Sequence, residues 1–202
     1  HMIPAPRTIF RNVRRIPAAH SLLIDEKGVQ EIRHWPLHFD EQHHEPFTVA
    51  RDTFRNLIRD SVAEEIAGHK RAGAFLSGGT DSSTVAGVLG QVTGAPAPAY
   101  SIGFEAEGYD EMEYARIAAR HFGCEHHEYY VTPADLLASI PAVAQHFDQP
   151  FGNSSALPAY YCAKVAKADG CTKMLAGDGG DELFGGNSRY AAQRVFEFYH
   201  AV

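Results

Sequence analysis

The chain has 202 residues, of which 45% are hydrophobic and 21% are charged, and its formal net charge is −7. This composition predicts a globular protein of one main core, and no apolar stretch reaches the roughly 18 to 20 residues of a membrane helix. Beyond residue 39, 12 Lys and Arg stand against 22 Asp and Glu, which excludes nucleic acid as an expected partner. We expect a cytoplasmic protein with no membrane partner.

The first elements predict a β-hairpin. Residues 8–39 show partial apolar alternation on either side of the turn-forming run Glu26-Lys27-Gly28, and they carry an excess of basic residues. A polar run from Asp40 to Glu45 follows. We therefore expect two parts: residues 1–45 form a hairpin and linker, and residues 46–202 form the main domain.

The main domain alternates between helical and strand patterns. Apolar residues recur at helical spacing from Phe47 to Ile66, and Gly68 is a plausible stop. Strand-like runs then follow at residues 72–76, 99–104, 127–131 and 174–176. Helical segments are expected from residue 81, at 110–121, from 134 and at 155–168. This order predicts an α/β fold with a doubly wound parallel sheet, whose ligands bind beyond the carboxyl ends of the strands.

The turn "SGGTDSS", residues 77–83, lies between the first expected strand of this sheet and its helix. Glycines there let backbone N–H groups approach a ligand, and the first turn of a helix attracts anions. The serines at 77, 82 and 83 add hydroxyl donors. The turn lacks the lysine of the P-loop and the G-x-G-x-x-G pattern of dinucleotide-binding folds. A different phosphate-binding chemistry is therefore needed.

Asp81 is out of place beside phosphate groups unless a cation lies between them. Capping the helix is the simpler role for an aspartate at this position. If it serves phosphate binding instead, Mg²⁺ held by one or two carboxylates plus phosphate oxygens resolves the repulsion. The run "MLAGDGGDELFGG", residues 174–186, supplies Asp178, Asp181 and Glu182 within one turn. Calcium is the alternative ion, but the EF-hand spacing is absent.

No site built on cysteine or histidine is expected. The three cysteines, at 124, 162 and 171, match neither a disulfide framework nor paired zinc ligands. His121, His126 and His127 lack cysteine companions and an H-E-x-x-H motif, so we interpret them as core or solvated residues.

Two motifs together resemble a known family. "SGGTDSS" resembles the pyrophosphate loop S-G-G-x-D-S of the N-type ATP pyrophosphatases, the PP-loop enzymes, among them NAD synthetase. "GDGGDELFGGNSRY", residues 177–190, narrows the resemblance to the asparagine synthetase B family, the glutamine-hydrolysing asparagine synthases. Residues 101–132 and 147–161 are similar to that family in order and spacing. The first residues resemble the last hairpin of its glutaminase domain.

The resemblance implies an adenine nucleotide alpha hydrolase fold and an AMP-forming ligase that uses ATP and Mg²⁺. Such an enzyme adenylates a carboxylate, aspartate in this family, and ammonia from glutamine then displaces AMP. The matching positions imply Asp81 and Asp181 as Mg²⁺ ligands and Asp178 near the reacting carboxyl. They imply nucleotide binding by Phe75, Ser77, Gly78, Gly79, Asp81, Ser82, Ser83, Ile102 and Gly177.

Three positions depart from the family pattern. Ala176 stands where serine is usual, and Gln149 and Asn153 stand where acids are usual. These changes leave open a family member that acts on another carboxylate. A non-catalytic nucleotide-binding domain is the alternative outside enzymes, and Ala176 favours it slightly.

Length is the larger departure. Family members begin with a cysteine nucleophile on a glutaminase domain and continue into a helical part with a catalytic lysine. We therefore expect this chain to be a fragment of a longer natural polypeptide, with little amide synthesis by itself. The sequence does not fix the oligomeric state, for which a homodimer is one candidate.

Overall fold

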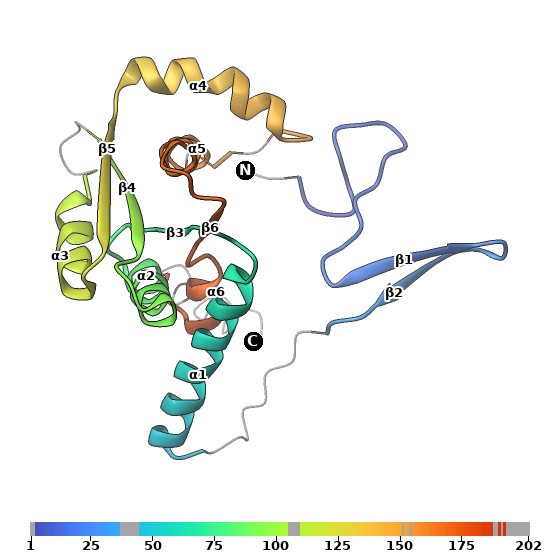
Figure 1. The fold of residues 1–202 in the computed structure, drawn as a ribbon. Helices are drawn as coiled ribbons and strands as arrows, with labels where there is room; N and C mark the ends of the chain where they lie inside the picture. Colours follow the sequence, from blue (N-terminus) through green and yellow to red (C-terminus); the bar gives the residue numbers. More distant parts are fainter. Residues whose placement is uncertain are drawn as a thin grey trace.

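The computed structural model describes residues 3–36, 45–104, 110–150, 152–153, 155–187, 190 and 192 (Figure 1). The expected linker from Asp40 to Glu45 lies outside these ranges, apart from Glu45 itself. Among the helices in the described ranges, none is both long and apolar enough to cross a membrane.

The N-terminal hairpin is present as a two-stranded antiparallel sheet of its own. Strand β1 spans His20–Asp25 and β2 spans Gly28–Arg33, with Asp25 opposite Gly28. The backbone N–H of Lys27 donates to the Asp25 carboxylate at 2.8 Å, which closes the turn. The hairpin extends away from the main sheet (Figure 1). The predicted hairpin is confirmed.

Four parallel strands form the main sheet in the order β5-β4-β3-β6. Strands β3 (Ala72–Phe75), β4 (Pro98–Phe104) and β5 (Glu125–Val131) follow one another outward. The chain then returns to the other side of β3 for β6 (Lys173–Leu175). The strand order therefore reverses between β3 and β6, and such a reversal opens a crevice at the carboxyl ends of the two strands.

Helices cover both faces of this sheet. The helices are α1 (Phe47–Ile66), α2 (Thr80–Thr93), α3 (Met112–Phe122), α4 (Pro133–His146), α5 (Ala156–Ala168) and α6 (Gly180–Phe184). One buried cluster joins α1, α2 and α3 to the sheet through residues such as Leu89, Ala99 and Met112. A second joins α5 to the opposite face through Tyr100 and Cys162. Helix α4 packs on α5 (Figure 1). The predicted doubly wound α/β fold is confirmed.

The bounds of these elements follow local sequence features. Parallel strands buried on both faces read as continuous apolar runs, as residues 72–76 do. Helix α4 begins with a capping box in which Thr132 and Asp135 satisfy each other's backbone N–H groups. Hydrogen bonds from Thr132 lower the pKa of the Asp135 carboxyl below its ordinary value. Helix α6 is a difference from the sequence analysis, which expected only an acidic turn there.

Candidate nucleotide site between two glycine-rich turns

The first turn, residues 76–79, connects β3 to α2 and is held by its own serines. Ser77 Oγ lies 3.0 Å from Ser82 Oγ, and the backbone N–H of Gly79 donates to Ser77 Oγ at 3.3 Å. Gly78 adopts φ +87°, and a Cβ there would lie 2.5 Å from the backbone nitrogen of Ala115. The residue must therefore be glycine both for its conformation and for its contact with α3.

The N-terminus of α2 carries no side-chain cap from the described residues. Its N-cap is Gly79 in an extended conformation, and Asp81 is the second residue of the helix, within its first turn. The simpler role considered for Asp81, a helix cap, is therefore wrong. Because no side chain caps the first turn of α2, its N–H groups remain available to an anion.

The second turn, residues 176–179, connects β6 to α6. Gly179 adopts φ +94°, and Asp181 and Glu182 lie in the first turn of the short helix that follows. Tyr190 lies close by, and burial raises its pKa, with the nearby carboxylates of Glu182 and Asp181 acting in the same direction. The second turn therefore presents acids at the edge of the sheet, beside the loop of residues 76–79.

The two turns are in direct contact through Asp81. A Cβ on Gly177 would lie 2.8 Å from the Asp81 carbonyl carbon, and one on Gly180 would lie 2.5 Å from its carboxyl carbon. Real side chains do not approach so closely, so the second turn can approach α2 only because both positions are glycine. The glycines of the second motif therefore bring its acids to Asp81.

A cavity of about 900 Å³ opens at this edge of the sheet. Nine of the eleven predicted site residues line it: Phe75, Ser77, Gly79, Asp81, Ser82, Ile102, Gly177, Asp178 and Asp181. The two others do not. Gly78 faces α3, and Ser83 has a buried hydroxyl with no hydrogen-bond partner among the described residues.

One part of the cavity is acidic and another is apolar. Five carboxylates line it, from Asp81, Glu111, Asp178, Asp181 and Glu182, and no Lys, Arg or His does so within the described ranges. The apolar part includes Phe75, Ile102, Phe104, Pro158 and Cys162. Apolar walls of this kind suit an uncharged ring, whereas the acidic part suits cations.

The thiol in the apolar wall is unreactive at neutral pH. Cys162 is buried, and its Sγ donates to the Tyr100 carbonyl oxygen at 3.3 Å. Burial raises the pKa of Cys162 to about 12, so the thiolate is not formed at neutral pH. Cys162 therefore contributes surface and not nucleophilic chemistry.

The described residues contain no group of three or more His, Cys, Asp or Glu arranged to hold a metal ion by themselves. A Mg²⁺ site of the expected kind needs only one or two carboxylates, because phosphate oxygens and water complete it. Asp81 and Asp181 line the same cavity and fit that requirement.

The sequence analysis missed the walls that come from α3 and α5. Met112 and Ala115 enter from α3, and Ser155, Pro158 and Ala159 enter from the start of α5. They carry no charge pattern, so nothing in the sequence separated them from ordinary packing residues. Gln149 and Asn153, which depart from the family pattern, do not line the cavity. The Asn153 side chain instead accepts a hydrogen bond from the Ser155 N–H at 2.9 Å, just before α5.

Comparison with known proteins places these motifs in context. The family model described as asparagine synthase matches residues 53–201. A candidate glutamine-hydrolysing asparagine synthetase of Methanocaldococcus jannaschii is 34% identical over 187 residues, which cover 91% of this chain and 36% of that protein. Glutamine-hydrolysing asparagine synthetase 1 of Bacillus subtilis is 29% identical over 93% of this chain and 29% of that protein. The chain thus spans about a third of the length of these relatives.

Two solved structures share part of the arrangement. An NH₃-dependent NAD synthetase from Campylobacter jejuni gives a TM-score of 0.43 at 12% identity, over 60% of this chain and 54% of that one. An NMN synthetase from Francisella tularensis gives 0.43 at 18% identity, over 58% and 50%.

Proposed function

The chain belongs to the asparagine synthase family, and from this premise we propose that it is the ATP-using core of an amide-forming, AMP-forming ligase. The observation that carries the proposal is the cavity at the strand-order reversal, where both glycine-rich turns meet. One turn offers free helix N–H groups and hydroxyls, and the other offers acids. An apolar wall adjoins both.

The reaction proceeds in two displacements. A carboxylate oxygen of the substrate attacks the α-phosphorus of ATP, and the bond to pyrophosphate breaks. Ammonia then attacks the carbonyl carbon of the acyl-adenylate, loses a proton, and expels AMP. A carboxylate is a poor electrophile, whereas the mixed anhydride is a good one, which is why adenylation precedes amide formation.

Different residues of the cavity bind different parts of the nucleotide in this proposal. We assign pyrophosphate to the first turn, with Ser77 and Ser82 as hydroxyl donors and the uncapped N–H groups at the start of α2 as backbone donors. Gly79, whose own N–H donates to Ser77, lines the cavity beside them. The apolar wall at Phe75 and Ile102 receives the adenine. Asp81 and Asp181 would hold Mg²⁺, which when bound neutralises charge on the departing pyrophosphate. Gly177, which lets the second turn pack against α2, lines the cavity on the nucleotide side.

The charge of the cavity bears on the substrate. Five carboxylates with no basic partner in the described lining repel a simple dicarboxylate but attract a substrate that carries an ammonium group. We therefore propose an amino acid substrate, with aspartate first and asparagine as its product, and assign Asp178 to the wall near the reacting carboxyl. Since neither Gln149 nor Asn153 lines the cavity, they argue less strongly for another carboxylate than the sequence suggested.

We further propose that glutamine supplies the ammonia through a glutaminase domain in the same natural polypeptide. The relatives are named as glutamine-hydrolysing, and this chain covers only about a third of their length. The hairpin supports the proposal because apolar side chains such as Leu23, Ile24 and Val29 are 50%, 72% and 67% exposed. Such surface in a two-stranded sheet indicates packing against a further part of the protein.

Exchange of labelled pyrophosphate into ATP by the full-length polypeptide tests this function. We expect exchange that requires Mg²⁺ and an amino acid carboxylate, strongest with aspartate among a panel of acids. Added ammonia should then give AMP and the amide in equal amounts. Binding of MgATP without exchange for any acid would instead indicate a non-catalytic nucleotide domain. Release of ADP rather than AMP would contradict adenylation.

A further inference from the structure

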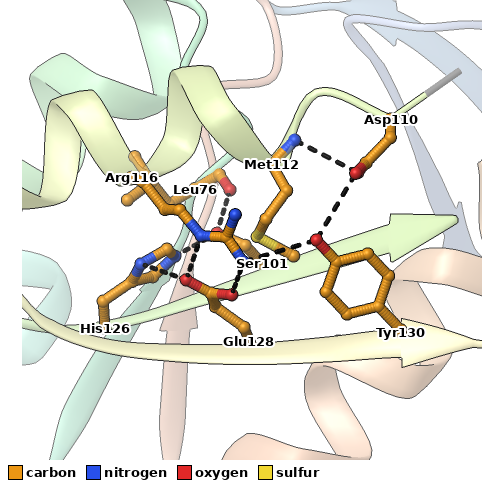
Figure 2. Close-up of polar contacts among 8 residues, drawn as sticks. All are labelled: Leu76, Ser101, Asp110, Met112, Arg116, His126, Glu128 and Tyr130. Carbon is orange, nitrogen blue, oxygen red and sulfur yellow. Dashed lines mark hydrogen bonds and ion pairs between the residues drawn. The ribbon is translucent and has the colours of Figure 1, made fainter. Parts of the chain in front are cut away.

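A chain of polar contacts reaches the first turn through residues that do not belong to either glycine-rich motif, and one of them, Ser101, also lines the cavity (Figure 2). It ends at Leu76, the residue between β3 and the turn. Ser101 of β4, only 3% exposed, donates from Oγ to the Leu76 carbonyl oxygen at 2.5 Å. Ser101 Oγ also lies 2.7 Å from Nε2 of His126 on β5.

The peptide unit between Leu76 and Ser77 is fixed at both of its polar groups. Its carbonyl oxygen accepts from Ser101, and its N–H donates to Ser82 Oγ at 3.2 Å. Ser82 Oγ is in turn 3.0 Å from Ser77 Oγ. Rotation of this single peptide would therefore displace both hydroxyls that we assign to pyrophosphate.

The chemistry of the contacts sets the proton positions. A serine hydroxyl has one proton, and a carbonyl oxygen can only accept, so the Ser101 proton points at Leu76. Ser101 Oγ must then accept from His126, which requires the proton on Nε2. The Nε2–H of His126 donates to a lone pair of Ser101 Oγ. This bond keeps the Ser101 hydroxyl proton directed at the Leu76 carbonyl oxygen.

His126 lies next to charged groups on two elements. Its Nδ1 lies 3.5 Å from Glu128 Oε1, and Glu128 accepts two hydrogen bonds from Arg116 of α3, at 2.8 and 2.5 Å (Figure 2). Burial lowers the pKa of His126, and Arg116 and the neighbouring His127 act in the same direction against Glu128. A neutral imidazole and an imidazolium both carry a proton on Nε2 in this arrangement, so the bond to Ser101 persists in either state.

We propose that Ser101 and His126 are positioning residues that fix the Leu76–Ser77 peptide, and so keep the first turn in the shape that receives pyrophosphate. The inference rests on the proposed function for its ligand but not for its geometry. The same elements also hold Gly78, because the start of α3 contacts it. The turn is thus held by α3 on one side and by Ser101 on the other.

Ser101→Ala tests the first step. The backbone amide of Ser77 should shift in ¹H–¹⁵N spectra and exchange with solvent about tenfold faster, because its peptide loses one of two anchors. The amide of Gly94, at the opposite end of α2 from the first turn, should not change. MgATP affinity should fall about tenfold, whereas AMP affinity should stay within about twofold, because AMP does not use the pyrophosphate turn.

His126 variants test the second step. His126→Gln keeps an N–H donor and should retain most of the MgATP affinity, whereas His126→Leu removes it and should reproduce the Ser101→Ala pattern. A purely structural role would lower MgATP and AMP affinity together and would not distinguish Gln from Leu. Unfolding midpoints measured alongside identify variants that fail to fold.

The outcomes separate the two proposals. An unchanged Ser77 amide in Ser101→Ala, or equal loss of MgATP and AMP binding, overturns the positioning role. A shifted amide in a protein whose wild type binds no MgATP leaves the positioning of the peptide standing and contradicts the proposed function.

Discussion

Gly180 lies against the carboxylate of Asp81, so closely that a Cβ on the glycine would be 2.5 Å from the Asp81 carboxyl carbon. Gly180→Ala should therefore push this carboxylate out of place, although alanine suits the start of α6 as well as glycine does. We expect MgATP affinity to fall by about tenfold or more, and the free energy of unfolding to fall by about 1–3 kcal/mol. Calorimetric titration and urea denaturation measure the two effects.

Gly90→Ala is the matched control for this substitution. Gly90 lies inside α2, and a Cβ there would meet its nearest neighbour at an ordinary 3.5 Å. Alanine should therefore stabilise the helix by about 0.5–1 kcal/mol and leave MgATP affinity unchanged. If both glycine variants lost affinity equally, the contact between Gly180 and Asp81 would not be the cause.

Asp81 and Asp181 should act together on a divalent ion. We expect Asp81→Asn and Asp181→Asn each to weaken ATP binding by about tenfold or more in the presence of Mg²⁺, with a double variant little worse than either single one. Chelation of Mg²⁺ by EDTA should have the same effect on the wild type, because no basic side chain lines the described cavity. Titration of ATP at several Mg²⁺ concentrations measures this.

Asp60→Asn provides the control for charge alone. Asp60 lies on an exposed part of α1 and does not line the cavity, and its substitution changes the net charge by the same amount. Additive losses for Asp81→Asn and Asp181→Asn would contradict a shared ion. Circular dichroism should show an unchanged fold in all these variants, because neither aspartate is buried in the core.

The sequence predicted the sheet and the meeting of the two turns for clear physical reasons. Buried parallel strands such as residues 72–76 leave continuous apolar runs, and the switch of strand order brings the ends of β3 and β6 together. Helix α6 was not predicted, because five residues are too few for a helical period to appear.

The finer structure of the site could not be predicted, because it depends on contacts between residues distant in the chain. Gly180 contacts Asp81 only because the starts of α6 and α2 pack so closely that no side chain fits between them. The bond between Ser101 and His126 joins strands 25 residues apart. The sequence offered one serine in β4 and four adjacent titratable residues at the start of β5, and core and solvated histidines look alike in such a pattern.

Gly78 should be more sensitive to alanine than a glycine that has only an unusual backbone angle. Gly94 adopts φ +67°, and a Cβ there would have no neighbour within 4 Å among the described residues. Gly94→Ala should therefore lower the free energy of unfolding by about 1 kcal/mol. Gly78 adopts φ +87° and also meets the backbone of Ala115. Gly78→Ala should therefore cost about 1–3 kcal/mol more in urea denaturation. Equal losses would mean that the contact with α3 adds nothing to the backbone strain.

The burial of His126 should make stability depend on pH in a defined direction. Its folded pKa lies below the ordinary value near 6.5, since burial, Arg116 and His127 outweigh Glu128. Well above pH 6.5 the side chain is neutral in both states and contributes nothing to the slope. As the pH falls below that value, the unfolded chain gains a proton first, and the folded state loses relative stability until its own pKa is passed.

His126→Gln should remove this part of the pH dependence, because glutamine does not titrate. We expect the free energy of unfolding of the wild type to fall more steeply than that of His126→Gln between about pH 7 and pH 5, measured by urea denaturation at each pH. A His126→Gln curve parallel to the wild type would mean that the imidazole is as easily protonated in the folded protein as in water, which is incompatible with its burial against Ser101.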